Sequence, residues 1–193
     1  MYYNLLLNRL PIYTPHRLKI RTDFRESIKF ELLMQDNSVK ERDKLMLALN
    51  LYYYDTSQIN DIQVAVDDLL WFYKGGKIKE ENVDEKVKKD NSKEKQIYSY
   101  EFDAEYIYSA FLEQYNIDLN SIKYLHWWKF RALFGSLNEN TQFSKIMGYR
   151  SMNTSKIKDK DMKKHYEKMK KLYALPDMRT EEQKENDFAE AFS

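Results

Sequence analysis

The stretch that decides the fold reads Tyr124-Leu125-His126-Trp127-Trp128-Lys129-Phe130-Arg131-Ala132-Leu133-Phe134 and contains two of the three tryptophans of the chain. On a helical wheel, the apolar residues in and just before it fall on two sides. One side holds Ile122, Leu125, Trp128, Ala132 and Leu133, and the second holds Trp127, Phe130 and Phe134. A helix that is apolar around most of its circumference is normally buried, with neighbours on several sides. We therefore predict a central helix here, capped by Asn120 or Ser121 and ended by Gly135.

The composition favours a soluble, intracellular and mainly helical protein. The 193 residues are 42% hydrophobic and 33% charged, which suits one domain of moderate size or two small ones. Only four glycines and three prolines argue against an all-β chain with many tight turns. The absence of cysteine excludes disulfides and thiolate sites. No apolar run approaches the roughly 20 residues of a membrane span, so we expect no contact with a membrane.

Helix signals follow one another along the chain after a short apolar start. Leu10 and Ile12, then Leu18 and Ile20, flank residues 13–17, which predicts a small N-terminal β-hairpin packed on the helices. The rest predicts a helical bundle of about seven to eight helices. They are expected over about residues 23–35, 38–53, 57–74, 103–115, 120–135, 141–148, 158–174 and 180–192. Ser38 is the expected cap of the second helix, and Gly75-Gly76 the stop of the third.

One charged segment divides the chain. From Lys77 to Lys95, thirteen of nineteen residues are charged, with mixed signs. Such a segment cannot bury enough apolar area to offset its ordering entropy, which predicts a flexible linker, with a frayed solvated helix as the alternative. The predicted parts are therefore residues 1–76, a β-hairpin with three helices, the linker at 77–96, and residues 97–193, built around the tryptophan helix.

No group of residues predicts catalysis or metal binding. The three histidines, His16, His126 and His165, are scattered and lack a two-histidine metal spacing. Acidic pairs such as Asp67-Asp68 suit a solvated helix face better than an oxygen cage for a hard cation. The sequence contains no glycine-rich phosphate loop and no nucleophile elbow. We expect a protein that is not an enzyme and has no cofactor.

A basic tract offers a contact surface. Between Lys145 and Lys171 there are ten Lys or Arg and only three Asp or Glu. Such a tract can hold a phosphate backbone, with Trp127, Tyr149 or Tyr166 stacking on bases. It can equally steer a charged protein, and residues 177–190, with six acidic and two basic residues, would partly neutralise it if they folded back. The nearly neutral total charge of +1 favours a protein partner and makes nucleic acid the weaker hypothesis.

Tryptophan, tyrosine and arginine are the residues that dominate binding hot spots, and they recur in this half of the chain. Trp128 is expected in the core, whereas Trp127 suits the core or the wall of a groove about equally. The predicted partner-binding residues are Trp127, Lys129, Arg131, Phe134, Tyr149, Arg150, Lys163, Lys164 and Tyr166.

Several of these runs carry a family resemblance. They are Tyr124–Phe134, Phe143-Ser144-Lys145-Ile146-Met147-Gly148-Tyr149-Arg150, Lys170-Lys171-Leu172-Tyr173-Ala174-Leu175-Pro176, and the N-terminal Thr22-Asp23-Phe24-Arg25 and Leu70-Trp71-Phe72-Tyr73. With them the chain, apart from about residues 77–97, resembles the bacteriophage gp-fifteen family of long-tailed phages and prophages of Gram-positive bacteria. The tryptophan run is the specific part of this likeness.

The resemblance implies a role in tail morphogenesis, most simply as a tail assembly chaperone that binds the tape-measure protein and recruits tail tube subunits. It also implies a place in the cytoplasm of the bacterial host and absence from the mature virion. The resemblance further implies that the protein corresponds to the extension part of a frameshifted chaperone. The alternatives are a structural tail or connector component and a nucleic-acid-binding module using residues 145–171. Self-association is a further expected contact, and the family supplies no catalytic residues to carry over.

Overall fold

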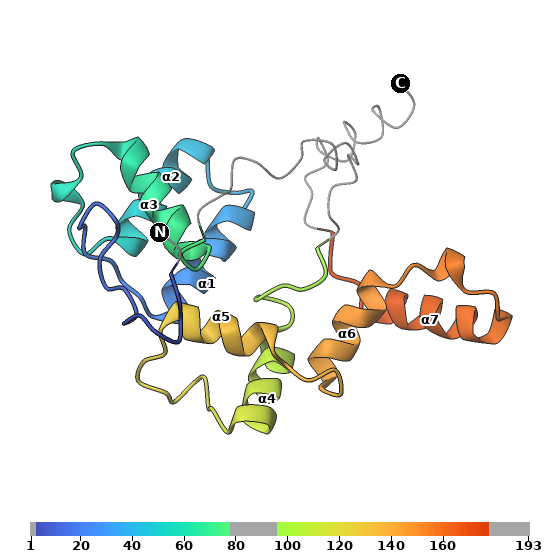
Figure 1. Ribbon diagram of the computed structural model, residues 1–193. Helices are drawn as coiled ribbons and strands as arrows, with labels where there is room; N and C mark the ends of the chain where they lie inside the picture. Colours follow the sequence, from blue (N-terminus) through green and yellow to red (C-terminus); the bar gives the residue numbers. More distant parts are fainter. Residues whose placement is uncertain (1–2, 78–95, 178–193) are drawn as a thin grey trace.

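The computed structural model describes residues 3–77 and 96–177, and these are mainly helical, as predicted (Figure 1). Seven α-helices and two short 3-10 turns follow one another in this part of the chain. They are α1 (Phe24–Gln35), α2 (Glu41–Tyr52), η1 (Thr56–Gln58), α3 (Ile62–Tyr73), α4 (Ala104–Tyr115), α5 (Trp127–Gly135), α6 (Gln142–Ser151), η3 (Thr154–Lys156) and α7 (Lys160–Leu172). The predicted linker at 77–96 and the predicted last helix at 180–192 lie almost wholly outside the described residues.

Local capping explains where most helices begin. The side chains of Asp23, Asp61, Thr141 and Asp159 each accept a hydrogen bond from a backbone N–H in the first turn of the helix that follows. The predicted cap Ser38 is wrong. Its hydroxyl and N–H both bind the Asp36 carboxylate, so α2 begins at Glu41 without a side-chain cap.

The predicted N-terminal β-hairpin is wrong, since residues 3–77 and 96–177 contain no strand. Tyr13 and Lys19 form a single isolated antiparallel bridge around a turn, in which Arg17 has a positive φ of 65°. Ile20 N–H still donates to Ile12 O at 3.2 Å, and Ile20 also bridges to Tyr53 directly after α2. A pairing this short does not form a β-ladder and is not stable alone, so it depends on the helices that it packs against.

The central helix begins at Trp127, several residues after the predicted cap. The preceding residues are held extended by the N-terminal part of the chain. Phe24 N–H donates to Leu125 O at 2.9 Å, and Trp127 N–H donates to Thr22 O at 2.8 Å. His126 is the actual cap, and its side chain accepts from the N–H of Trp128. A contact that spans about a hundred residues therefore sets this helix start.

One core joins the two predicted parts. α1 packs against α2 and also against α5, while α4 packs against α6. Phe130 of α5 is fully buried and stacks on Phe24 of α1 at 4.9 Å and on Phe111 of α4 at 5.0 Å between ring centroids. The division of the chain near residues 77–96 stays a prediction, but the described residues on both sides of it share this core.

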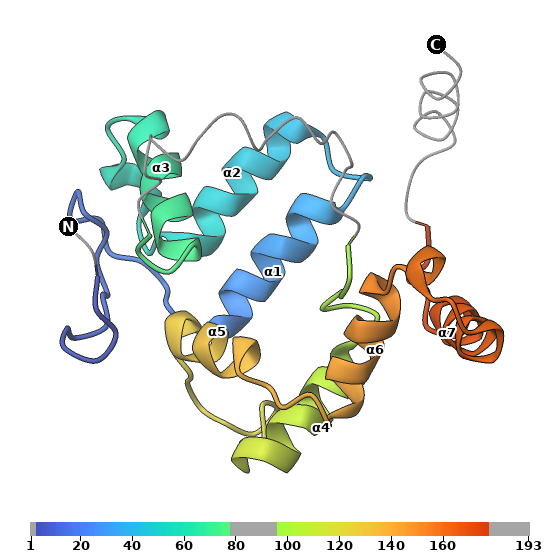
Figure 2. The same cartoon turned by 45° about the vertical axis from the view of Figure 1, so that its right-hand side comes forward.

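Helix α7 stands apart from that core. In both views it lies at the edge of the molecule, with α6 between it and the other helices (Figures 1 and 2). It contacts α6 and η3, and none of its residues is buried. None of the helices in the described ranges is both long and apolar enough to cross a bilayer.

Candidate protein-interaction surface

The tryptophans of α5 are internal. Trp127 is 2% exposed and Trp128 is 4% exposed, so the prediction of a buried Trp128 is confirmed and Trp127 joins it. Their indole N–H groups donate to Tyr73 O at 2.8 Å and Phe72 O at 2.7 Å. These two carbonyls belong to the last turn of α3, and Phe72 O also accepts the N–H of Gly75 at 3.0 Å. The tryptophan pair therefore caps the C-terminus of α3.

The glycine turn after α3 makes this capping possible. Gly75 and Gly76 have φ angles of 78° and 76°, which side chains with a Cβ rarely adopt. A Cβ on Gly76 would also lie 2.6 Å from the Trp128 ring. The predicted helix stop is confirmed, and it also gives the indole room to approach the backbone.

The other predicted residues of α5 differ in exposure. Lys129 is exposed and points away from the core. Arg131 is half-buried, with its guanidinium over the Trp127 ring at 5.9 Å. Phe134 is half-buried against Tyr98 and Phe143, at centroid distances of 5.2 and 5.3 Å. These three do not form a continuous patch with exposed aromatic residues.

Arg150 is a buried structural residue. Its guanidinium binds both carboxylate oxygens of Asp103, at 2.5 and 2.8 Å. It also donates to Tyr173 O at 2.5 Å and Ile97 O at 3.1 Å. Asp103 precedes α4, so this one side chain connects α4, α6, the end of α7 and the segment before Tyr98. Bidentate pairing of this kind fixes orientation as well as distance.

The pair α6–α7 forms a helical hairpin whose inner seam is aromatic. Phe143, Ile146 and Arg150 are buried on the side of α6 that faces the body. Tyr149 lies toward α7, where its ring stacks on Tyr173 at 6.0 Å and contacts Tyr166 at 6.2 Å. Helix α6 therefore has two packing sides, one for the core and one for α7.

We call the half-exposed seam of this hairpin the hairpin face. It contains Tyr149, Met162, Lys163, Tyr166, Met169 and Tyr173. Its three tyrosines and Met169 are half-buried, and Met162 is 53% exposed. Tyrosine and methionine are enriched where proteins bind one another, because they offer large, adaptable contact area.

The charge of α7 is strongly positive. The helix carries six lysines and two carboxylates. Lys163 lies 3.9 Å from Glu167, and Lys170 donates to Met152 O at 2.6 Å. Within residues 3–77 and 96–177, no carboxylate lies in ion-pair distance of Lys164, Lys168 or Lys171. At helical spacing, these three exposed lysines lie on the outer side of α7, opposite the side that carries Tyr166, Met169 and Tyr173.

The structure brings together three of the nine predicted partner-binding residues. Tyr149, Lys163 and Tyr166 lie on the hairpin face, and Lys164 lies on the outer side of α7. Trp127 and Arg150 are buried, and Lys129, Arg131 and Phe134 belong to α5. Met162, Met169 and Tyr173 were missed as site residues. Their spacings of seven and four place them on one side of the helix, and this spacing is the signal in the sequence that could have found them.

Other apolar features on the described surface include a hollow and an exposed turn. A hollow of about 220 Å³ lies between α1, α4 and α5, lined by Ile28, Ile107 and Phe130 among others. The turn at residues 5–7, held by the Asn4 carboxamide, exposes three leucines. Neither feature contains a predicted site residue.

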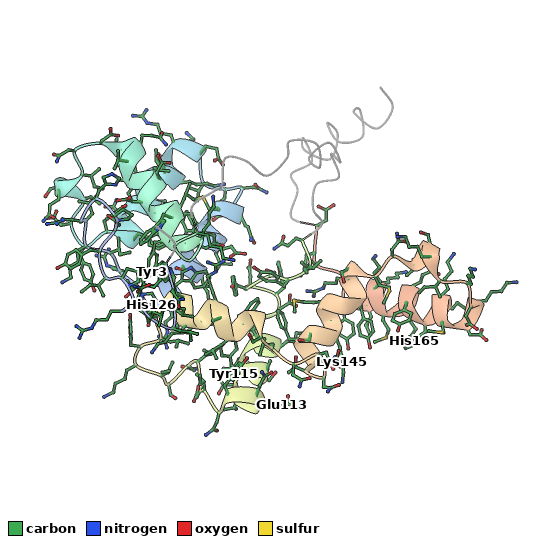
Figure 3. All side chains as sticks on the ribbon, viewed as in Figure 1. Tyr3, Glu113, Tyr115, His126, Lys145 and His165 are labelled. Carbon is green, nitrogen blue, oxygen red and sulfur yellow. The ribbon has the colours of Figure 1, made fainter. Side chains whose placement is uncertain are left out.

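The histidines do not converge. His126 lies near Tyr3 at one end of α5, and His165 lies on α7, far across the molecule (Figure 3). His16 binds the buried carboxylate of Asp68 at 2.9 Å. In the part of the chain that the structure describes, no three His, Asp or Glu side chains gather as metal ligands.

Comparison with known proteins supplies the family. The model of the family described as Bacteriophage Gp15 protein matches residues 6–175, which is most of the chain. The resemblance seen in the sequence is thereby confirmed. The comparisons with curated proteins and with solved structures gave no match.

Proposed function

The chain belongs to the Bacteriophage Gp15 protein family, and on that premise we propose that it is a tail assembly chaperone in phage tail morphogenesis. In this role it binds the tape-measure protein before the tail tube encloses that protein, and it brings tail tube subunits to it. The observation that carries the proposal is the hairpin face, where half-exposed tyrosines and methionines line the seam of a helix whose outer side is rich in exposed lysines.

The hairpin face suits an amphipathic helix. A long helical chain that awaits enclosure needs its apolar side covered, and the cover must later come off. Tyr149, Tyr166 and Met162 can contact the apolar side of such a helix, as in other helix-in-groove complexes. The unbranched thioether adapts to different neighbours, so one face can serve successive segments of the same partner.

Weak, repeated contact fits the same role. One hairpin offers a small surface, and interfaces of small area are usually transient. Many copies along one tape-measure chain would gain avidity, since each bound copy raises the local concentration for its neighbours. Release during tube assembly then requires only that each single contact is weak.

Co-expression with the tape-measure protein of the same phage tests the proposal. The double variant Met162→Ala/Tyr166→Ala should lose about tenfold or more in affinity, as expected for central contact residues. The matched control is Met46→Ala/Tyr54→Ala, because Met46 is 49% exposed and Tyr54 is 57% exposed on the opposite side of the molecule. Circular dichroism should show the same helix content for both variants.

Two results would count against the chaperone role at this face. The wild-type chain could fail to co-purify with the tape-measure protein, or both double variants could weaken binding equally. In the first case the partner is wrong, and in the second the hairpin face is not the site.

The proposal also places the protein in the host cytoplasm and outside the finished particle. Mass spectrometry of purified virions should find no stoichiometric amount of it. Its presence at a fixed copy number would favour the alternative, a structural tail or connector component.

The unpaired lysines of α7 favour nucleic acid as a second candidate partner. Phosphate contacts through Lys164 and Lys168 would make binding fall steeply with salt. Gel-shift titrations at several salt concentrations should show only weak, non-specific binding. A Lys164→Glu change that abolishes tight binding to DNA or RNA would establish this second function instead.

A further inference from the structure

Three leucines lie on the outside of a short N-terminal turn, and we call residues 5–7 the leucine turn. The exposed fractions of Leu5, Leu6 and Leu7 are 43%, 91% and 82%. The Asn4 carboxamide oxygen accepts the N–H of Leu6 at 2.9 Å and of Leu7 at 3.3 Å, and Asn8 N–H donates to Asn4 O at 2.9 Å. The turn is therefore preorganised, and its apolar side chains gain free energy by leaving water.

The leucine turn is held in place at both ends. Before it, Tyr3 packs edge-on against Trp128, with 4.5 Å between the ring centroids. After it, the imidazole of His126 donates to Pro11 O at 3.1 Å. In both views the N-terminal segment (dark blue) and α4 are separated by α5 (Figures 1 and 2). The turn therefore does not reach the neighbourhood of α4 in its own chain.

The hollow between α1, α4 and α5 suits an apolar guest. It has a volume of about 220 Å³, and apolar side chains such as Ile28, Ile107, Leu119 and Phe130 line it. A cavity of about 150 Å³ accepts a benzene ring, so this hollow has room for a leucine side chain.

The charges around the turn and the hollow are opposite. Residues 3–22 contain four Lys or Arg and no Asp or Glu, and Arg9 is exposed directly after the leucine turn. Residues 96–122 contain five Asp or Glu and no Lys or Arg. Asp118 lies at the rim of the hollow, because its carboxylate accepts a hydrogen bond from Tyr108, which lines it. Complementary charge of this kind orients an encounter between two surfaces.

The acidic side of the hollow is not neutralised by its neighbours. Glu105 is exposed and directly follows Ala104, another lining residue. Arg25 and Lys29 of α1 are already paired with carboxylates at the start of their own helix. Among the residues that the structure describes, neither Glu105 nor Arg9 forms an ion pair.

We propose that the leucine turn of one copy inserts into the hollow of a second copy, with Arg9 beside the carboxylates of Glu105 and Asp118. The turn and the hollow lie on different surfaces, so a pair of copies keeps one free turn and one free hollow. Such a contact builds rings or open rows. A single turn buries little surface, which makes the contact weak and dependent on concentration. It requires no other protein, so its failure leaves the proposed chaperone role standing.

Sedimentation equilibrium of the full-length chain over a concentration series tests the contact. The average mass of the wild type should rise with concentration. Leu6→Ser/Leu7→Ser removes the guest and Ala104→Phe fills the hollow, so each should lower the association constant by about tenfold or more. A wild type that stays monomeric at every concentration overturns the proposal.

Matched controls separate this contact from general stickiness. Leu47→Ser/Leu172→Ser changes two other exposed leucines, and Ala132→Phe adds the same ring at an exposed position of α5. Both controls should associate like the wild type. Circular dichroism should give the same helix content for all four variants. An Ala104→Phe chain that still associates like the wild type overturns the proposal, because the hollow is then not the receptor.

Mixing the two defective variants decides the geometry. The leucine variant keeps an intact hollow, and the Ala104→Phe variant keeps an intact turn. An equimolar mixture should therefore form a one-to-one heterodimer and nothing larger, although neither variant associates alone. A mixture that stays monomeric overturns the proposal.

Charge reversal tests the orientation. Arg9→Glu should weaken the association severalfold, because it places a carboxylate against the acidic rim. Adding Glu105→Arg to the same chain should recover most of that loss, since each copy then carries both reversed charges. A double variant that associates more weakly than Arg9→Glu would overturn the proposed orientation.

Discussion

Helices α5 and α7 carry similar side chains, and the fold gives them opposite roles. Both combine aromatic rings with Lys or Arg, and the sequence predicts partner contacts in both. In α5 the tryptophans and Phe130 are buried, and the indoles donate to the end of α3. In α7 none of the apolar side chains is buried, and most of the lysines are exposed. Composition indicates what a helix can contact, and its neighbours decide whether that contact is internal.

The largest expected effect breaks the core at α5. Phe130→Ala should lower the free energy of unfolding by about 3–5 kcal/mol, because it leaves a cavity between Phe24 and Phe111. Chemical denaturation measures the loss. Met162→Ala on α7 is the paired comparison. A loss below about 1 kcal/mol for Phe130→Ala would contradict the contrast between the two helices.

A second large effect acts where the hairpin joins the body. Arg150→Met should cost about 3–5 kcal/mol, because it leaves the buried Asp103 carboxylate unpaired. The double variant Arg150→Met/Asp103→Leu should recover most of that loss, since it removes the stranded charge. Denaturation curves of the wild type, the single variant and the double variant show how much of the lost stability is due to the unpaired Asp103 carboxylate. A double variant as unstable as the single one would show that the contacts of Arg150 with Ile97 O and Tyr173 O dominate instead.

An intermediate effect concerns pH. His126 accepts the Trp128 N–H at Nδ1, so its Nε2–H donates to Pro11 O at 3.1 Å. The pKa of His126 is lowered, chiefly because the side chain is buried. The hydrogen bond to Pro11 O acts in the opposite direction and raises the pKa, whereas the positive charge of Lys129 lowers it further. Below about pH 6.5 the unfolded chain gains a proton that the folded chain does not, so stability falls as the pH falls.

This pH effect has a limit and a control. A single group changes the unfolding free energy by at most about 1.4 kcal/mol per pH unit. His126→Asn keeps a capping side chain and should flatten stability between pH 5 and 6.5 relative to the wild type. His165→Asn, at an exposed position of α7, should leave the profile unchanged. An unchanged profile in His126→Asn would assign the pH dependence to other groups.

The smallest effect on stability is expected on the hairpin face. Met162→Ala should change the unfolding free energy by no more than about 0.5 kcal/mol, as should Met46→Ala on α2. Calorimetry compares the two directly. A much larger loss for Met162→Ala would show that this side chain is already packed, which would contradict its role as a free contact.

Local signals in the sequence predicted most of the fold. Helices α1 and α6 begin directly after Asp23 and Thr141, at the predicted starts near residues 23 and 141, because a cap acts within its own first turn. Gly75-Gly76 ends α3 for a similarly local reason. The hairpin and the start of α5 were predicted wrongly, because backbone pairing of Ile20 with Tyr53 and of Asp23 with His126 decides them.

The site was less predictable for the same reason. Burial of Arg150 depends on Asp103, and burial of Trp127 depends on the carbonyl of Tyr73. Neither partner is near in sequence, and no local pattern reveals it. The residues of the hairpin face share helical spacing, and the sequence predicted some of them as partner-binding residues. The exposure of the hairpin face could not be predicted from the sequence. It depends on the absence of another helix on the outer side of α7 within the described residues.

The indole caps on α3 have a consequence for the way the protein is made. The first three helices leave the ribosome well before Trp127 and Trp128 do, so the carbonyl of Tyr73 meanwhile lacks its indole partner. Domains generally fold as units during synthesis. Here the first half completes its packing only once α5 has emerged, and a nascent chain stalled shortly after Gly76 should remain open to proteases that the finished protein resists.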